Sequence, residues 1–486
     1  MTQDSATIRQ RIGLFAGPVA FIAILLTPSP EGLSIEAWRV AAVAALMVVW
    51  WISEALPIAA TALLPIVLFP VLGVTDISGA TTPFANPLIY LFLGGFIIAL
   101  GMERSGLHRR IALNIIRAVG THPRAIAAGF MLAAAFLSMW VSNTATAMMM
   151  LPIALSVVRL VEGDEGSEKN DAFALVLLLA LAYACNIGGL GTLIGTPPNA
   201  LLAAYLLDNH DVEIGFAQWL LIGLPLVIVA LPLVYLLLTR VLFSVDTKEL
   251  PGGRELIRKE LANAGRMSRA EKQVAMIFVL TAGLWITRPM IESWLPGLSD
   301  TGIAIFGALL LFVVPLEWKN WRFVLTWRDT SRLPWEVLIL FGGGLSLAAG
   351  ISNSGLAEWI GQAFDQLDGL SVVVLIALAV SAIIFLTEVT SNTATAAAFL
   401  PILGSVAVGM GLDPIVLAAP AAVAASCAFM LPVATPPNAI VYGSGRIAIP
   451  QMARAGLLIN FAMIILITAL MYALLGRAFS ADLMPG

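Results

Sequence analysis

The hexapeptide Ser-Asn-Thr-Ala-Thr-Ala occurs twice in this chain, at 142–147 and at 391–396, and Leu-Pro-Ile follows each copy at the same distance. Both copies lie inside long apolar segments, where hydroxyl and amide side chains are costly to bury unless they are bonded to something. A single copy would be compatible with side chains that bond back to their own helix. Two copies in equivalent surroundings indicate a binding site built from two halves of the chain.

The composition places both motifs in a membrane protein. Hydrophobic residues make up 59% of the 486 residues and charged residues 12%. Apolar blocks recur along the chain at about the length of a membrane-spanning helix, roughly 20 residues. The two cysteines, Cys185 and Cys427, lie in apolar segments, which favours a packing role and gives no support to a disulfide framework or a thiolate metal site.

These blocks predict an all-α polytopic membrane protein with eleven transmembrane spans and two re-entrant hairpins. The spans are predicted at 12–28, 38–52, 55–73, 87–103, 171–207, 217–240, 273–289, 300–316, 334–351, 414–443 and 455–476. The regions near 124–160 and 370–408 are too long for one helix and too short for two spans with a loop, so each is predicted to be a hairpin. Three segments that mix charged and apolar residues are predicted to be interfacial helices, at 107–119, 253–264 and 355–364.

The distribution of positive charge supports this topology. With a cytoplasmic N-terminus, all 26 Lys and Arg residues except Arg39, Arg288 and Arg477 fall on the cytoplasmic side, as the positive-inside rule requires. The predicted location is the cell inner membrane, with a cytoplasmic N-terminus and an extracytoplasmic C-terminus. The absence of any Asn-X-Ser/Thr sequon fits a bacterial membrane.

The internal similarity extends beyond the hexapeptide. Eight residues between Leu91 and Leu107 recur 249 positions later (391 − 142) between Leu340 and Leu356. A second shared motif, Thr-Pro-Pro-Asn-Ala, stands at 196–200 and 435–439. Each repeat contains three spans, a hairpin, a broken span and a final span. This is an odd number of crossings, so the second copy is predicted to be inverted relative to the first, in a five-plus-five architecture with one extra N-terminal span.

The polar motifs have the composition of helix starts. Ser, Asn and Thr are preferred N-cap residues, and Pro is well tolerated in a first helical turn. Four helix N-termini would then converge near the bilayer midplane, where their free N–H groups and partial positive charge favour an anion. No Lys, Arg or His lies within ten residues of either hexapeptide, so bound cations are predicted to neutralise a dianionic substrate.

Sodium ions suit this role because interrupted helices expose backbone carbonyls beside side-chain oxygens. Ser138 and Thr387 stand one turn before the two hexapeptides, and Gly195 allows the backbone to bend toward an ion. Two acids in the membrane body, Glu54 and Glu388, are candidates for a proton relay. The alternative for Glu388 is a hydrogen-bonded structural partner of a hairpin limb, and Glu54 is expected at the cytoplasmic boundary, where it is easily solvated. Glu388 is the better placed to tune the site because it lies three residues before Ser391.

Together these motifs resemble the divalent anion/sodium symporter (DASS) family, which includes bacterial INDY-type dicarboxylate transporters. The run Trp-Trp-Ile-Ser-Glu-Ala-Leu-Pro at 50–57, both Ser-Asn-Thr motifs and both Thr-Pro-Pro-Asn motifs carry the resemblance, which covers about 37–476. The resemblance implies that the substrate carboxylates are held by Ser142, Asn143, Thr144, Ser391, Asn392, Thr393, Thr435 and Pro436. It implies one sodium site at Ser138, Ser142, Asn143 and Gly195, and a second at Thr387, Asn392 and Ala434.

The resemblance also implies a homodimer in which a transport domain moves against a scaffold, as an elevator. The scaffold would comprise 1–122 (spans 1–4 and an interfacial helix) and 246–368 (an interfacial helix and spans 7–9). The transport domain would comprise 123–245 (hairpin, broken span 5, span 6) and 369–486 (hairpin, broken span 10, span 11).

The function expected is sodium-driven import of a small dicarboxylate such as succinate, malate or fumarate. Sodium ions would be the coupling ions, with no other cofactor, and the partners would be the dicarboxylate, sodium and the bilayer, with no nucleic acid. Alternatives within the same fold are a sodium-coupled citrate or sulfate transporter and a dicarboxylate exchanger. An anion channel also uses convergent helix N-termini. An enzyme is not expected, because no nucleophile, base and orienting residue assemble near the motifs.

Overall fold

The computed structural model describes residues 7–120, 122–162, 168–243, 253–363 and 370–479. Most of this part of the chain is helical, and its strands form one short antiparallel ribbon of β1 (Pro315–Glu317) and β2 (Arg322–Phe323). The predicted all-α class is therefore confirmed.

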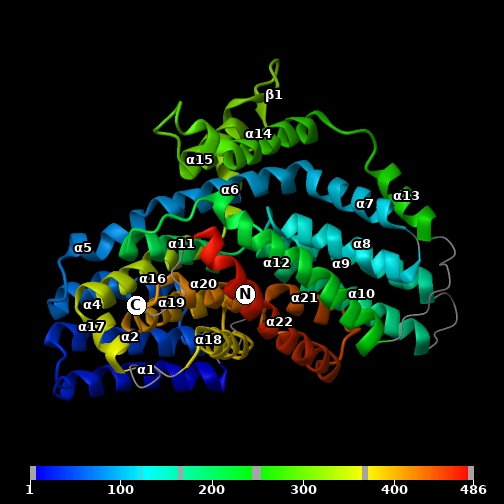
Figure 1. Cartoon of the computed structure of the whole chain (residues 1–486). Coiled ribbons are helices and arrows are strands. Elements are labelled where there is room, and N and C mark those ends of the chain that lie inside the picture. The colour runs from blue at the N-terminus through cyan, green and yellow to red at the C-terminus, as the bar shows by residue number, and fades with distance from the viewer. Residues whose placement is uncertain (1–6, 121, 163–167, 244–252, 364–369, 480–486) are drawn as a thin grey trace.

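The first half of the chain begins with helices that pack at one edge of the molecule and ends with long helices through its centre (Figure 1). Its elements are α1 (Ile8–Leu26), α2 (Ile35–Ser53), α3 (Ile58–Ala62), α4 (Leu64–Leu72), α5 (Ile77–Thr81), η1 (Thr82–Ala85), α6 (Pro87–Ser105), α7 (Leu107–Val119), α8 (Pro123–Ser138), α9 (Asn143–Glu162), α10 (Glu168–Gly189), α11 (Pro197–His210), α12 (Phe216–Leu236) and η2 (Leu237–Leu242).

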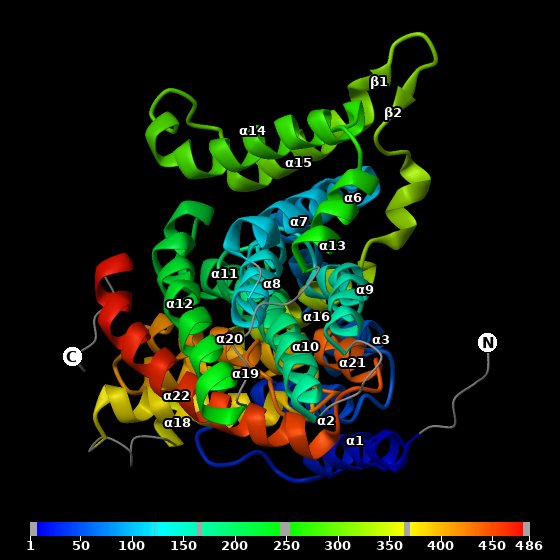
Figure 2. The same ribbon diagram turned by 90° about the vertical axis from the view of Figure 1, so that its right-hand side faces the viewer.

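The second half contains two helices that lie side by side in both ribbon views, α14 and α15 (Figure 2). Its elements are α13 (Gly253–Asn263), α14 (Arg269–Ile291), α15 (Asp300–Val313), β1, β2, η3 (Trp327–Arg332), α16 (Trp335–Asn353), α17 (Leu356–Ala363), α18 (Val372–Thr387), α19 (Asn392–Gly409), α20 (Ile415–Ala425), α21 (Pro436–Tyr442) and α22 (Ile449–Ala478).

The helix bounds reproduce the repeat. The first hairpin consists of α8 and α9, and the second of α18 and α19. The bounds of α8, 123–138, shifted by 249 are those of α18, 372–387, and the starts of α9 and α19 keep the same offset. The three segments predicted to be interfacial helices correspond to α7, α13 and α17, although residue 364 lies outside the described part of the chain.

Burial separates the helices at the centre from those that would face lipid. In α10, 94% of the most apolar window is buried, against 11% in α1. Large apolar side chains on α14 are exposed, among them Met276, Val279 and Met290, as expected for a helix that meets hydrocarbon. Ten of the described helices are long and apolar enough to cross a membrane, and five shorter apolar helices accompany them. The count of eleven spans stays a prediction.

The predicted third span, 55–73, is not one continuous helix. It consists of α3 and α4, which are separated at Leu63. Pro65 lies in the first turn of α4 and has no N–H to donate to the carbonyl four residues earlier, so the helical ladder is interrupted there. The predicted domain boundaries at 245/246 and 368/369 fall at residues outside the described ranges.

Candidate substrate and sodium site

Each hexapeptide lies at the tip of a hairpin, where the second limb starts. The helices α9 and α19 begin at Asn143 and Asn392, the second residues of the two motifs. Ser142 caps α9, because its Oγ accepts a hydrogen bond from the N–H of Ala145 at 3.2 Å. Ser391 is the N-cap of α19 but makes no capping bond with its side chain. Both helix starts therefore fall where the sequence predicts them, and the side-chain cap is present in the first copy.

The second pair of motifs starts the second halves of two broken helices. The helix α10 ends at Gly189 and α11 begins at Pro197, with Thr196 as N-cap. In the other repeat α20 ends at 425 and α21 begins at Pro436, with Thr435 as N-cap. Each Thr-Pro-Pro-Asn motif thus starts a helix after a loop, as predicted.

The asparagine of each Thr-Pro-Pro-Asn motif fixes the loop that precedes it. Both side chains are fully buried, and each amide donates two hydrogen bonds to carbonyl oxygens of its own loop. The acceptors are Gly189 and Thr192 for Asn199, at 3.2 and 2.9 Å, and Ala428 and Leu431 for Asn438, at 3.2 and 3.1 Å. All three positions correspond at an offset of 239 (438 − 199). No role is predicted for these asparagines from the sequence, although their presence in both copies of the motif is a signal that could have revealed one.

Hydrogen bonds join the two broken helices across the halves of the chain. Asn186 Nδ2 donates to Thr435 Oγ1 at 3.1 Å, and the hydroxyls of Thr196 and Ser426 lie 3.1 Å apart. The helices also pack across the two halves: α11 packs against α19 and α20, and α21 packs against α9 and α10. Each Thr-Pro-Pro-Asn helix therefore joins the hairpin and broken helix of the other repeat, and all four polar motifs meet in one region.

Asn143 and Gly195, two of the residues expected to bind the first sodium ion, lie close together. A Cβ atom placed on Gly189 would lie 3.1 Å from Asn143 Oδ1 and 3.0 Å from the Gly195 carbonyl oxygen, so the amide and that carbonyl converge on this glycine. Asn143 Oδ1 is buried and has no hydrogen-bond partner in the described part of the chain. Ser138 is fully buried beside the thiol of Cys185. A buried oxygen without a donor fits a cation ligand.

The second group of oxygens lies in the other half. The hydroxyl of Thr387 is 2.8 Å from Asn392 Oδ1 and 2.9 Å from the Ala425 carbonyl oxygen. One hydroxyl hydrogen faces two acceptors, so three oxygens meet here with a single proton to share. Ala434 is buried in the loop before α21, where its N–H donates to the Leu431 carbonyl.

The predicted substrate ligands differ in exposure in a way that suits an open site. Ser142 and Pro436 are exposed, and Thr435 is buried. The others are half-buried, namely Asn143, Thr144, Ser391, Asn392 and Thr393. The assignment of these residues to substrate and sodium stays a prediction.

Glu388 anchors the second broken helix to the second hairpin. Its carboxylate, 3% exposed, accepts hydrogen bonds from the N–H groups of Phe429, Met430 and Leu431 and from Asn460 Nδ2, at 2.7–3.1 Å. These contacts support the interpretation of Glu388 as a hydrogen-bonded structural partner. Asn460, on α22, was not singled out in the sequence.

Glu54 and Arg9 form a charged contact at the second hairpin tip. Glu54 follows α2 in a left-handed conformation and pairs with Arg9 at 3.3 Å, with both side chains at least 40% exposed. Arg9 also donates to the carbonyl of Val389, in the turn before Asn392. Arg9 is 380 positions from Val389 in the sequence, so its proximity to the hairpin tip could not be predicted. Because Glu54 neutralises Arg9, the contact adds no net positive charge at the tip.

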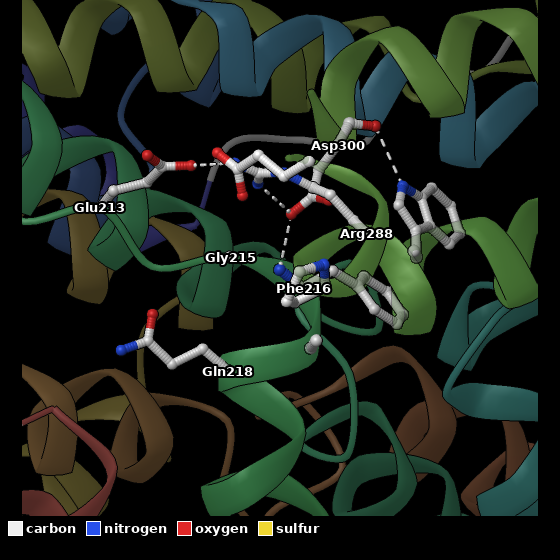
Figure 3. Close-up of a pocket in the computed structure, with 10 residues that line it drawn as sticks. Glu213, Gly215, Phe216, Gln218, Arg288 and Asp300 are labelled. Carbon is white, nitrogen blue, oxygen red and sulfur yellow. Dashed lines mark hydrogen bonds and ion pairs between the residues drawn. The ribbon is translucent and has the colours of Figure 1, made fainter. Parts of the chain in front are cut away.

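A cavity of about 230 Å³ lies elsewhere, at the start of α12 (Figure 3). None of the predicted site residues lines it. Its one guanidinium, from Arg288, pairs with three carboxylates, those of Glu213, Glu292 and Asp300. This excess of negative charge disfavours a dianion.

The fold and the paired motifs define a polytopic membrane transporter built from two related halves. The family model described as "Sodium:sulfate symporter transmembrane region" matches residues 9–479. The chain therefore belongs to this family of sodium-linked transporters, which is the family that the motifs resemble.

Two relatives carry the same printed description, "Sodium-dependent dicarboxylate transporter SdcS". The protein from Staphylococcus saprophyticus is 45% identical over 486 residues, covering 98% of this chain and 94% of that protein. A Staphylococcus aureus protein is 46% identical over 482 residues, covering 98% and 93%.

Two solved structures share the fold. The Alcanivorax borkumensis YdaH transporter superposes with a TM-score of 0.59 at 16% identity, over 89% of this chain and 98% of that one. Neisseria gonorrhoeae MtrF gives 0.55 at 14% identity, over 94% of both chains. At such low identity the likeness concerns the fold alone.

Proposed function

We propose that this chain imports small dicarboxylates by sodium symport. Near full-length relatives described as sodium-dependent dicarboxylate transporters support the substrate class and the coupling ion. The observation in the molecule that carries the proposal is the paired arrangement of neutral oxygens and helix starts around Asn143 and Asn392. Helix N-termini favour the carboxylates, and the oxygen groups on either side suit sodium.

Sodium would act as the counter-charge of the substrate. Neither hexapeptide has a cationic residue within ten positions, and the one arginine that the fold brings to a hairpin tip is neutralised by Glu54. A dicarboxylate would therefore bind weakly until cations occupy the neighbouring oxygens. The coupling of transport to sodium follows from this dependence.

The movement that we propose is an elevator in a homodimer. The segments 123–245 and 369–486, which hold both hairpins and both broken helices, would move together against 1–122 and 246–368. The hydrogen bonds between Asn186 and Thr435, and between Thr196 and Ser426, support a single moving body because they join its two parts. The N-terminus is proposed to lie in the cytoplasm and the C-terminus outside, in the cell inner membrane.

Uptake of labelled succinate into proteoliposomes tests the proposal. We expect uptake to require an inward sodium gradient and to stop when choline replaces sodium. Uptake that is equal in sodium and choline would contradict symport. Uptake that requires an internal dicarboxylate instead of a sodium gradient would identify an exchanger.

A second candidate is a sodium-coupled transporter of sulfate, because the family model's description names sulfate. Citrate is a further anion that the same site chemistry would admit. Competition of labelled succinate uptake by unlabelled malate, fumarate, citrate and sulfate separates these cargoes. Stronger competition by sulfate or citrate than by the dicarboxylates would reassign the substrate.

A further inference from the structure

The start of α12 is held by a side chain from another helix. The N-cap of α12 is Gly215, which has no side chain with which to cap it. Asp300, in the first turn of α15, takes this role, because its Oδ2 accepts the N–H of Phe216 at 2.7 Å (Figure 3). A carboxylate at a helix N-terminus is a favourable partner for the helix dipole.

Arg288 fixes the carboxylate of Asp300. Its Nη1 lies 3.3 Å from Asp300 Oδ2, and its Nη2 lies 2.9 Å from Glu213 Oε1 on the chain just before α12. The side chains of Arg288 and Asp300 are 14% and 8% exposed. Because the Asp300 carboxylate is largely removed from water, loss of Arg288 would leave its charge without the cation that faces it, whereas Arg288 would still pair with Glu213 and Glu292 if Asp300 were lost. The segment that leads into α12 is thus held at two points, at Glu213 by Arg288 and at Phe216 by Asp300.

A stack of aromatic rings continues from this ion pair to the first hairpin tip. The rings of Phe216 and Trp285 stack at 4.6 Å, and Trp285 Nε1 donates to the Asp300 carbonyl at 2.9 Å. On the other side, the ring of Trp140 lies 5.9 Å from that of Phe216 and 4.8 Å from that of Phe278. Trp140 stands two residues before Ser142, so Phe216 directly contacts the tip that carries the first hexapeptide.

The same end of α12 also contacts the first broken helix. Trp219, one turn after Phe216, donates from Nε1 to the Leu190 carbonyl at 3.0 Å. A Cβ atom on Gly223 would lie 2.6 Å from that same carbonyl oxygen, so only a glycine permits this approach. The position of α12 thus sets both the hairpin tip and the loop between α10 and α11.

We propose that Asp300 and Arg288, which belong to the proposed scaffold, are positioning residues for the first half of the site in the conformation of this structure, where scaffold and moving segment are in contact. By fixing the start of α12, they set the separation between the hairpin tip that carries Asn143 and the loop that carries Gly195. Ligands of an ion must be held within about 0.5 Å of their working geometry by the groups behind them. This inference rests on the proposed function, since it assigns the two residues an effect on sodium binding.

Two substitutions separate the contributions of Asp300. Asp300→Asn keeps an oxygen that accepts the Phe216 N–H but removes the charge that faces Arg288, and Asp300→Ala removes both. The half-saturating sodium concentration for succinate uptake is expected to rise on the order of tenfold for Asp300→Ala, as is typical when groups behind metal ligands are lost. A smaller rise is expected for Asp300→Asn. The maximal rate at saturating sodium should stay within about twofold of wild type.

A second buried ion pair on the same helix is the matched control. Glu271, in the first turn of α14, pairs with Arg110 of α7 at 2.6 Å, and the two side chains are 7% and 15% exposed. Glu271→Ala should lower the melting temperature as Asp300→Ala does, yet leave the half-saturating sodium concentration unchanged. Glu292→Gln removes the weakest pair in the cavity, at 3.7 Å and 52% exposure, and should alter neither quantity.

Two quantities are measured for each variant: the sodium dependence of succinate uptake, and the rise in melting temperature that sodium causes in the purified protein. A smaller sodium-induced rise for Asp300→Ala than for Glu271→Ala supports the inference. Equal behaviour of these two variants overturns it, while a sodium-dependent wild type keeps the proposed function intact. A wild type without sodium dependence overturns the proposed function and the inference with it. If Asp300→Ala is not recovered as folded protein, Asp300→Asn and Arg288→Lys carry the same comparison.

Discussion

The two halves of the site have the same skeleton but are fastened in different ways. In the first half, the Thr192 hydroxyl donates to the Met139 carbonyl and the ring of Trp140 joins an aromatic stack. In the second half, the positions equivalent to Met139 and Trp140 are Glu388 and Val389 (139 + 249 and 140 + 249). There a buried carboxylate binds the loop, and Arg9 binds the tip. The helix starts define the site symmetrically, whereas these direct attachments are uncharged on one side and charged on the other.

This difference predicts unequal sensitivity to mutation. A ring stack loses packing energy when it is truncated, but its neighbours can partly relax. A buried carboxylate that four N–H groups share cannot be removed without leaving those donors unpaired in an apolar interior. The second half should therefore depend on one side chain, and the first half on several.

The largest effect is expected for Glu388→Ala. Four buried donors lose their acceptor, so we expect a loss of several kcal/mol in stability, since each unsatisfied donor costs about 1–3 kcal/mol. Little folded protein and no uptake should be recovered. Glu388→Gln keeps one carbonyl oxygen and should be milder. Thr192→Val, which removes the hydrogen bond to Met139 in the first half, should cost only about 1 kcal/mol. Equal losses of melting temperature in the Glu388 variants and in Thr192→Val would contradict the asymmetry.

Asn143→Ala and Asn392→Ala should abolish transport while the protein stays folded. Each amide lies at the start of a hairpin limb and contacts the oxygen group of its own half. We expect uptake near background, with elution from size-exclusion chromatography and melting temperature close to wild type. Full transport by both variants would show that the asparagines of the hexapeptides do not belong to the binding site.

Asn199→Ala and Asn438→Ala should have matching effects, because their hydrogen bonds are equivalent in the two repeats. Each substitution removes two hydrogen bonds, one to each of two carbonyl oxygens, for an expected loss of about 1–3 kcal/mol. Thermal melting measures the effect directly. A loss confined to one variant would show that the similarity of the two loops does not extend to their energetics.

The smallest effect is expected for Arg9→Gln. The pair with Glu54 is exposed, and exposed pairs contribute about 0–1 kcal/mol. Melting temperature should hardly change, and sodium-dependent uptake should persist with a modest change in rate, because the tip loses one contact from α1. Loss of uptake comparable to that of Asn392→Ala would place Arg9 within the site and break the comparison.

The sequence anticipated much of this architecture because its signals are local. Helix starts at Asn143 and Asn392 follow from capping preferences that act within one turn, and the hairpins follow from segment length. Leu63 shows the limit, since a span was predicted over 55–73 but the interruption of its helix before Pro65 was not. Asn199 and Asn438 were visible in the repeated motif, but nothing in the chain near them says which carbonyls they bind.

By itself, the sequence determined the helical class, the two repeats, the polar helix starts and the family, because hydropathy, capping and repetition are properties of short windows or of their comparison. Only the tertiary structure decided what holds those starts in place. Glu388 meets Asn460, Arg9 meets Val389, and Asp300 meets Phe216 across 72, 380 and 84 positions. Such contacts depend on how the helices pack in three dimensions, which no window of the chain contains.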